Sequence, residues 1–145
     1  MYLVDTNVLS MGAPGRREGA AALTDWLDTR SDDLFLSTIT VAEIGDGIAK
    51  LRRLDSLARA NHLDDWLVVG LHLYGDRVIP FDIPAARLAG LLMDRARATG
   101  QSPGFADLAI AATAGFHDLT VLTRNVRHFA PVDIPAIDPF RSLPD

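Results

Sequence analysis

Cysteine is absent from the 145 residues, which excludes disulfide bonds and thiolate metal sites. Long uninterrupted apolar runs are also missing, so no segment is expected to span a membrane. The opening stretch MYLVD resembles the start of a strand rather than a charged leader followed by an apolar run and a cleavage site. We therefore expect no signal peptide and a cytoplasmic location.

Lysine is nearly absent as well, because Lys50 is the only lysine among 14 basic residues. The formal net charge is −5, whereas a protein that holds nucleic acid by bulk electrostatics is usually basic. A large non-specific DNA-binding surface is therefore not expected. The charge balance still suits an enzyme that gathers acidic side chains around cations and carries a few local arginines.

The composition is that of a folded domain. Hydrophobic residues make up 48% of the chain and charged residues 23%, which argues against disorder and low complexity. The length suits one hydrophobic core, and no repeat, linker or boundary interrupts the chain. We expect a single compact domain over residues 1–145.

Short apolar strands alternate with helical segments along the chain. This alternation predicts an α/β fold in which a mainly parallel central sheet is flanked by helices. A glycine-rich patch, residues 12–19, is expected to be a mobile loop that carries Arg16 and Arg17. The expected strands are residues 2–4, 34–37, 77–81 and 119–125 with a short last one around Ile137, and the longer expected helices are residues 20–30, 38–54, 55–74 and 84–99.

Oxygen-bearing side chains follow several of these strands. In a parallel sheet, ligands bind beyond the carboxyl ends of the strands. Asp5 follows the first strand, and Glu43 lies in the helix after the second. Asp107 lies in the first turn of a later helix, and Asn125 ends the strand expected at residues 119–125. These four side chains are expected to project toward one end of the sheet.

Each of the four has an ordinary structural alternative. Asp5 is a candidate N-cap, and Thr40 with Glu43 matches a capping box. Asp107 would complement the positive end of a helix dipole. Asn125 would be an ordinary turn residue.

The apolar neighbours of the three acids favour a functional explanation. Clustered acids in apolar surroundings have raised pKa values unless a cation neutralises them. An all-oxygen cluster with few nearby lysines suits Mg²⁺ or Mn²⁺. The histidines are not paired at ligand spacing, since His62 and His72 are ten residues apart and His117 and His128 eleven. Zinc is not expected.

Four segments, MYLVDTNVLS, TVAEIGDGI, ADLAIAATA and LTRNVRHF, resemble in order the motifs of PIN-domain ribonucleases. The resemblance is to VapC-type toxins of bacterial toxin–antitoxin pairs, including the FitB-like branch. It implies a PIN-domain-like fold and metal-dependent hydrolysis of RNA that leaves 5′-phosphate and 3′-hydroxyl ends. The expected cofactor is Mg²⁺, with Mn²⁺ as the alternative.

The resemblance also assigns roles to individual residues. It implies that Asp5, Glu43 and Asp107 bind the metal and are catalytic. The fourth acidic position of the family holds Asn125 here, and many relatives have Asp where this chain has His128. The residues expected to support the site or meet substrate are Thr6, Asn7, Thr123, Asn125 and Arg124, with a solvated surface position as the alternative for Arg124.

The resemblance further implies partners. They are an RNA substrate, a second copy of the chain in a homodimer and a cognate antitoxin, with operator DNA contacted only through that antitoxin. The apolar surface between about Ala49 and Trp66 is the expected antitoxin contact. The alternative is a catalytically weak PIN-like module that binds RNA or a partner protein. A haloacid-dehalogenase-like hydrolase fits less well, because it wants a second acid at position 7, which is Asn7.

Overall fold

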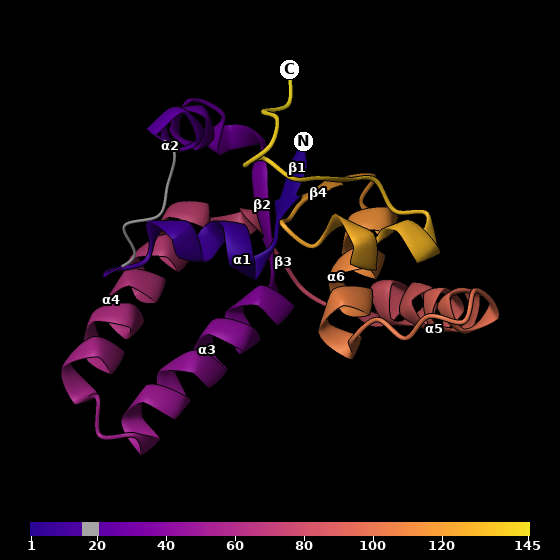
Figure 1. Ribbon diagram of the computed structural model, residues 1–145. Coiled ribbons are helices and arrows are strands. Elements are labelled where there is room, and N and C mark those ends of the chain that lie inside the picture. The colour runs from indigo at the N-terminus through magenta and orange to yellow at the C-terminus, as the bar shows by residue number, and fades with distance from the viewer. Residues whose placement is uncertain (16–20) are drawn as a thin grey trace.

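The computed structural model describes residues 1–15 and 21–145. A central sheet has the strand order β3-β2-β1-β4-β5, and every pair of neighbouring strands is parallel (Figure 1). This confirms the predicted α/β class. The strands are β1 (Tyr2–Val4), β2 (Leu34–Ser37), β3 (Val78–Ile79), β4 (Thr120–Leu122) and β5 (Ala136–Ile137).

Successive strand residues point to opposite faces of the sheet and so build two cores. In β1, Leu3 packs into one core and Val4 into the other. In β4, Val121 and Leu122 divide in the same way. Both faces are covered, because each parallel crossover places helices over the sheet.

Two long helices cover the face that Leu3 occupies. They are α5 (Ile83–Ala98) and α6 (Phe105–Phe116), which pack against each other on one side of the sheet (Figure 1). The stretch from Leu108 to Ala114 is buried throughout, so α6 is the most enclosed helix of the described residues. The opposite face is covered by α1 (Thr6–Leu9) and α2 (Ala21–Thr29), and Trp26 of α2 packs against that core.

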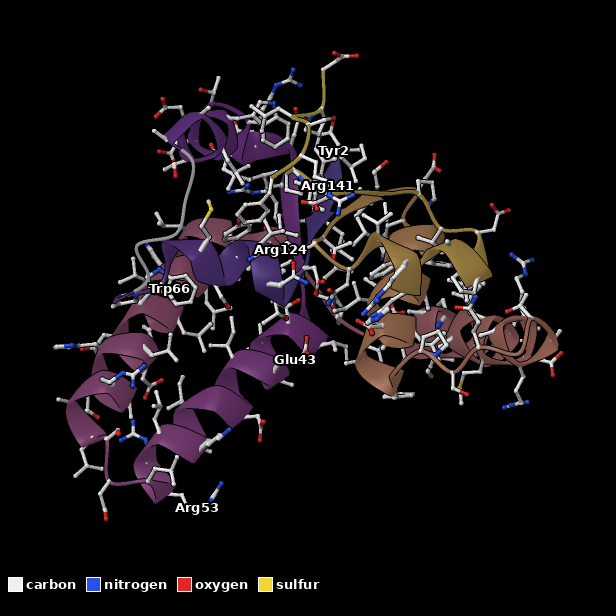
Figure 2. All side chains as sticks on the ribbon, viewed as in Figure 1. Tyr2, Glu43, Arg53, Trp66, Arg124 and Arg141 are labelled. Carbon is white, nitrogen blue, oxygen red and sulfur yellow. The ribbon has the colours of Figure 1, made fainter. Side chains whose placement is uncertain are left out.

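A helical hairpin extends away from the sheet (Figure 1). It consists of α3 (Thr38–Arg53) and α4 (Leu57–Tyr74), held together by a small apolar cluster that includes Ile44 and Leu67. Arg53 lies at the far end of α3, whereas Glu43 lies toward the sheet (Figure 2).

The observed elements differ from the predicted ones mainly at their ends. The third strand is only Val78–Ile79, because Arg77 belongs to a short 3₁₀ helix and Pro80 has no N–H to donate to a strand neighbour. The fourth strand ends at Leu122 rather than at Asn125. Arg16 and Arg17, predicted to lie in a mobile loop, fall outside the described residues. No helix among the described residues is long and apolar enough to cross a membrane.

Candidate functional site

The three acids predicted to form the site come from three separate elements. Asp5 follows β1, Glu43 lies in the second turn of α3, and Asp107 is the third residue of α6. The carboxyl end of β1 lies beside that of β4, because the Asp5 N–H donates to the Leu122 carbonyl at 3.0 Å. The sheet topology therefore brings residues that are far apart in the sequence to one edge.

Asp5 is a buried carboxylate, with only 4% of its surface exposed. Its Oδ1 accepts a hydrogen bond from the Thr6 N–H at 2.7 Å, so Asp5 is also the N-cap of α1, as the structural alternative predicted. Its Oδ2 accepts from the Thr123 hydroxyl at 2.6 Å and from the Asn7 amide at 2.8 Å. The capping bond engages only Oδ1, and Oδ2 faces the Thr123 and Asn7 side chains.

Burial raises the pKa of Asp5 above its ordinary value, and the nearby Asp107 carboxylate raises it further. Hydrogen bonds from Thr123, Thr6 and Asn7 oppose this increase but do not cancel it. A carboxyl group with a raised pKa and an acidic neighbour gains from a positive charge nearby.

Glu43 is held toward Asp5 by a single hydroxyl. The Thr6 Oγ1–H donates to Glu43 Oε1 at 2.6 Å. The Glu43 residue is exposed, but partial shielding of its carboxylate raises its pKa, and Asp5 and Asp107 add to the increase. The three carboxylates are therefore electrostatic neighbours.

The predicted capping box of Thr40 and Glu43 is wrong. The N-cap of α3 is Ser37, whose side chain accepts from the Ile39 N–H, so α3 begins three residues earlier than that pairing requires. The Thr40 hydroxyl is instead buried without a hydrogen-bond partner among the described residues. Glu43 is thus left free to face the other acids.

Asp107 lies in the first turn of α6, where its negative charge also complements the helix dipole. The helix N-cap is Gly104, which has no side chain to accept a capping bond. Asp107 Oδ2 lies 2.8 Å from His128 Nδ1. His128 was noted in the sequence only as a departure from the family, and its contact with Asp107 was not predicted.

The segment that follows β4 supports this edge of the sheet. Thr123 Oγ1 donates to Asp5 and accepts from the Asn125 N–H at 3.0 Å and from the Asn7 amide at 3.2 Å. Asn7 Oδ1 in turn accepts from the Arg124 N–H at 3.0 Å. Asn125 caps a short 3₁₀ helix through its backbone carbonyl and not through its side chain.

Arg124, the arginine expected to meet substrate, lies at the edge of this network. The guanidinium of Arg124 lies 4.7 Å from the centre of the Phe140 ring, and the residue is exposed beside α1 (Figure 2). Arg124 thus combines exposure with a backbone contact to the network around Asp5.

A groove of about 540 Å³ begins at Thr6 and Glu43 and runs along the hairpin of α3 and α4. Its walls are mainly apolar, including Ile44, Leu51 and Leu63. Arg59 and His62 also line it. The groove thus connects Glu43 to the surface between about Ala49 and Trp66, which is the expected antitoxin contact.

The donor chemistry fits a hard divalent cation. Asp5, Glu43 and Asp107 offer only oxygen ligands. The pKa values of Asp5 and Glu43 are raised mainly by burial and further by neighbouring carboxylates, and a cation would oppose both effects. Among the described residues, no three acidic or histidine side chains converge tightly enough to form a closed metal site. The carboxylates are neighbours that would need side-chain adjustment to share one ion.

Comparisons with known proteins agree with this arrangement. The chain is 37% identical over 142 residues to "Toxin FitB" of Neisseria gonorrhoeae, covering 97% of this chain and 99% of that protein. It is 35% identical over 145 residues to "VapC ribonuclease Y4jK" of Sinorhizobium fredii, covering 97% and 98%. The crystal structure of FitAcB from Neisseria gonorrhoeae superimposes with a TM-score of 0.83 at 37% identity, covering 97% of this chain and 99% of that chain.

The PIN domain family model matches residues 2–134, which span β1 through the segment just before β5. The match therefore includes all three acids, the Thr6–Glu43 contact and the Asp107–His128 contact. The chain belongs to the PIN-domain family.

Proposed function

We propose that this chain is a metal-dependent endoribonuclease and the toxin of a toxin–antitoxin pair. The observation that carries the proposal is the buried Asp5 carboxylate, whose pKa is raised by burial and by its neighbour Asp107. A structural cap would not require a second carboxylate beside it. The names of FitB as a toxin and of Y4jK as a ribonuclease support the same assignment.

The proposed metal ligands are Asp5, Glu43 and Asp107, with Mg²⁺ as the expected ion and Mn²⁺ as the alternative. A bound ion of this kind would neutralise the phosphodiester and lower the pKa of a water molecule. The protein's own contribution is positioning. Thr123 and Asn7 hold Asp5, and Thr6 holds Glu43, so hydrogen bonds orient two of the three acids.

The exposed side chains around the acids are proposed to meet RNA. Arg124 is the proposed phosphate contact, since its backbone is tied to Asn7 and its guanidinium is exposed at the edge of the site. Asn125 adds no negative charge at the fourth position and is proposed to lie near the bound water or substrate. These roles follow from placement and from the likeness to other PIN-domain proteins.

The groove along α3 and α4 is the proposed antitoxin site. Its lining combines apolar side chains of the hairpin with Glu43, so a segment bound there would also contact one of the three acids. We further propose that the toxin forms a homodimer. Operator DNA is proposed to be contacted by the antitoxin and not by this chain, whose net charge is −5.

A second candidate function is RNA or protein binding without efficient cleavage. Two observations favour it: Asn125 stands where the family has a fourth acid, and the described residues contain no closed metal site. A binder would retain the groove and Arg124 but would show no metal-dependent cleavage.

The deciding experiment incubates the purified protein with total RNA in Mg²⁺, Mn²⁺ or chelator. Cleavage is expected with either ion and not with chelator. Asp5→Asn and Asp107→Asn are expected to abolish it, whereas Asp94→Asn, an exposed acid of α5 that pairs only with Arg97, is the matched control. Cleavage that persists in chelator, or in both site variants, would contradict the proposal.

A further inference from the structure

His128 ends the short 3₁₀ helix Val126–His128, and its side chain meets that of Asp107 of α6 at the edge of the acidic cluster. His128 Nδ1 lies 2.8 Å from Asp107 Oδ2, and the two side chains are 34% and 23% exposed. Asp107 precedes the buried stretch of α6 that begins at Leu108. His128 precedes Phe129, which is fully buried. Both partners of the contact therefore directly precede buried positions of the core.

The direction of this hydrogen bond follows from its chemistry. An ionised carboxylate only accepts, so Nδ1 carries the hydrogen and donates it to Oδ2. The neutral Nδ1–H tautomer and the doubly protonated ring both provide this donor, so the contact does not depend on a charged histidine. It engages one oxygen of Asp107 and leaves Oδ1 as the other possible ligand atom.

The segment between residues 123 and 128 therefore holds two of the three acids with donors at its two ends. Thr123 donates to Asp5 Oδ2 at 2.6 Å, and His128 donates to Asp107 Oδ2 at 2.8 Å. The two ends are linked, because the His128 N–H donates to the Asn125 carbonyl and the Asn125 N–H donates to Thr123. The segment supplies hydrogen-bond donors where a fourth carboxylate would add negative charge.

We propose that His128 is a positioning residue for the divalent-cation site: its Nδ1–H fixes the Asp107 carboxylate and directs the other oxygen toward the ion. The inference rests on the proposed function, since it presupposes that Asp107 is a ligand. Partners of this kind fix the orientation of a ligand, and their loss typically weakens metal binding about 10–100-fold. His128 thus adds no negative charge to the site but holds the Asp107 carboxylate by a hydrogen bond.

The main alternative is that His128 weakens metal binding. A histidine that holds Asp107 away from the ion would weaken binding, and its removal would strengthen it. A purely structural histidine would affect folding but not the affinity of the folded protein. These three cases predict different metal affinities, so binding can separate them without reference to cleavage.

The test measures Mn²⁺ binding to the purified full chain by calorimetry and by the electron paramagnetic resonance signal of free Mn²⁺. His128→Leu removes the donor and is expected to weaken binding about tenfold. His128→Asn places an amide N–H close to the position of Nδ1 and is expected to restore most of the affinity. His128→Gln places its amide near the position of Nε2 and is expected to behave like His128→Leu, which gives the same comparison if the leucine variant fails to fold.

Two controls make the outcome specific. His117→Leu alters an exposed histidine that follows α6 and lies edge-to-face against Phe116, and it is expected to leave Mn²⁺ affinity unchanged. Asp5→Asn is expected to reduce Mn²⁺ binding strongly. If Asp5→Asn does so and His128→Leu binds Mn²⁺ as tightly as the wild type or more tightly, the role of His128 is wrong and the metal site stands. If Asp5→Asn has no effect, the metal site itself is wrong.

Discussion

The Thr6 hydroxyl donates to Glu43 Oε1 at 2.6 Å and so joins two residues that are 37 positions apart in the sequence. Thr6 is the first residue of α1, and its own N–H donates to Asp5 at 2.7 Å. One residue thus orients two of the three acids, one through its backbone and the other through its side chain.

We predict that Thr6→Val slows RNA cleavage about tenfold, equivalent to about 1.4 kcal/mol of transition-state free energy. The variant keeps the N–H to Asp5 but loses the donor to Glu43, whose pKa should rise further. Thr6→Ser keeps the hydroxyl and should retain most of the rate. Steady-state kinetics on a defined RNA would measure both, and an equal loss in the two variants would argue against this role of the hydroxyl.

Thr123→Val should destabilise the metal-free protein by about 1.5–3 kcal/mol, since its hydroxyl donates to a buried carboxylate. Thr113→Val is the matched control, because Thr113 is equally buried but donates only to the Ala109 carbonyl within α6. Its expected cost is about 1 kcal/mol or less. Urea unfolding gives both free energies, and equal values would mean that the Asp5 contact adds nothing.

Asn7→Asp would place a second carboxylate 2.8 Å from Asp5 Oδ2 in place of the donor amide. We predict a loss of about 1–3 kcal/mol in unfolding free energy without metal, because the buried Asp5 oxygen loses one of its two side-chain donors and gains a like charge beside it. Mn²⁺ should restore more stability to this variant than to the wild type. Asn61→Asp is the control, since Asn61 accepts from Arg52 on the exposed hairpin. Equal stability of Asn7→Asp and wild type at neutral pH would contradict the prediction.

The stability of the metal-free protein should decrease as the pH rises through the raised pKa values of Asp5 and Glu43. Their ordinary values are 3.8 and 4.5, and burial raises both in the folded chain. Between the ordinary and the raised values the folded state binds more protons than the unfolded state, so these groups favour folding at the lower pH and lose that contribution as the pH rises.

Asp5→Asn removes one of these groups and should flatten the pH dependence. Urea unfolding at a series of pH values between about 4 and 8 would measure the difference in slope between the two proteins. Identical slopes would mean that Asp5 ionises as easily in the folded chain as in the unfolded one.

Arg124→Gln should raise KM for RNA and leave kcat nearly unchanged, because Arg124 is proposed to contact phosphate and not the reacting atoms. Arg97→Gln is the control for loss of one surface charge, since Arg97 lies exposed on α5 and pairs with Asp94 at 3.5 Å. Kinetics at two salt concentrations would show a weaker salt dependence for Arg124→Gln alone. Equal KM values for the two variants would mean that Arg124 does not contact RNA and only packs against Phe140 at the surface.

Much of the fold followed from patterns that act locally. The apolar runs YLV, LFLS and TVL formed strands because their side chains are buried on both faces of a parallel sheet. The helix predicted over residues 20–30 is α2, and the strand predicted around Ile137 is β5. The ends of elements were harder to predict, because backbone hydrogen bonds can continue past a regular strand. The Thr123 N–H, for example, donates to the Ile137 carbonyl although β4 ends at Leu122.

The sequence by itself determined the residue types that this edge of the sheet presents. Asp5, Glu43 and Asp107 each stand next to an apolar run, and acids in such places need a partner. The spacing of Thr40 and Glu43 also suggested a capping box that the structure does not contain. The same spacing occurs inside a helix that begins earlier, and here the N-cap is Ser37. The order of strands and the crossovers were left to the three-dimensional packing.

Only the tertiary structure decided which donor each acid received. Thr123 reaches Asp5 across 118 positions and His128 reaches Asp107 across 21, and no local pattern encodes either contact. Such contacts arise when β1 and β4 become neighbours in the sheet and α6 packs beneath the segment that follows β4. The sequence therefore determined which charged and polar groups are present, and the packing determined the distances between them. A hydrogen bond forms only within a few ångströms, and the order of residues along the chain does not give such distances.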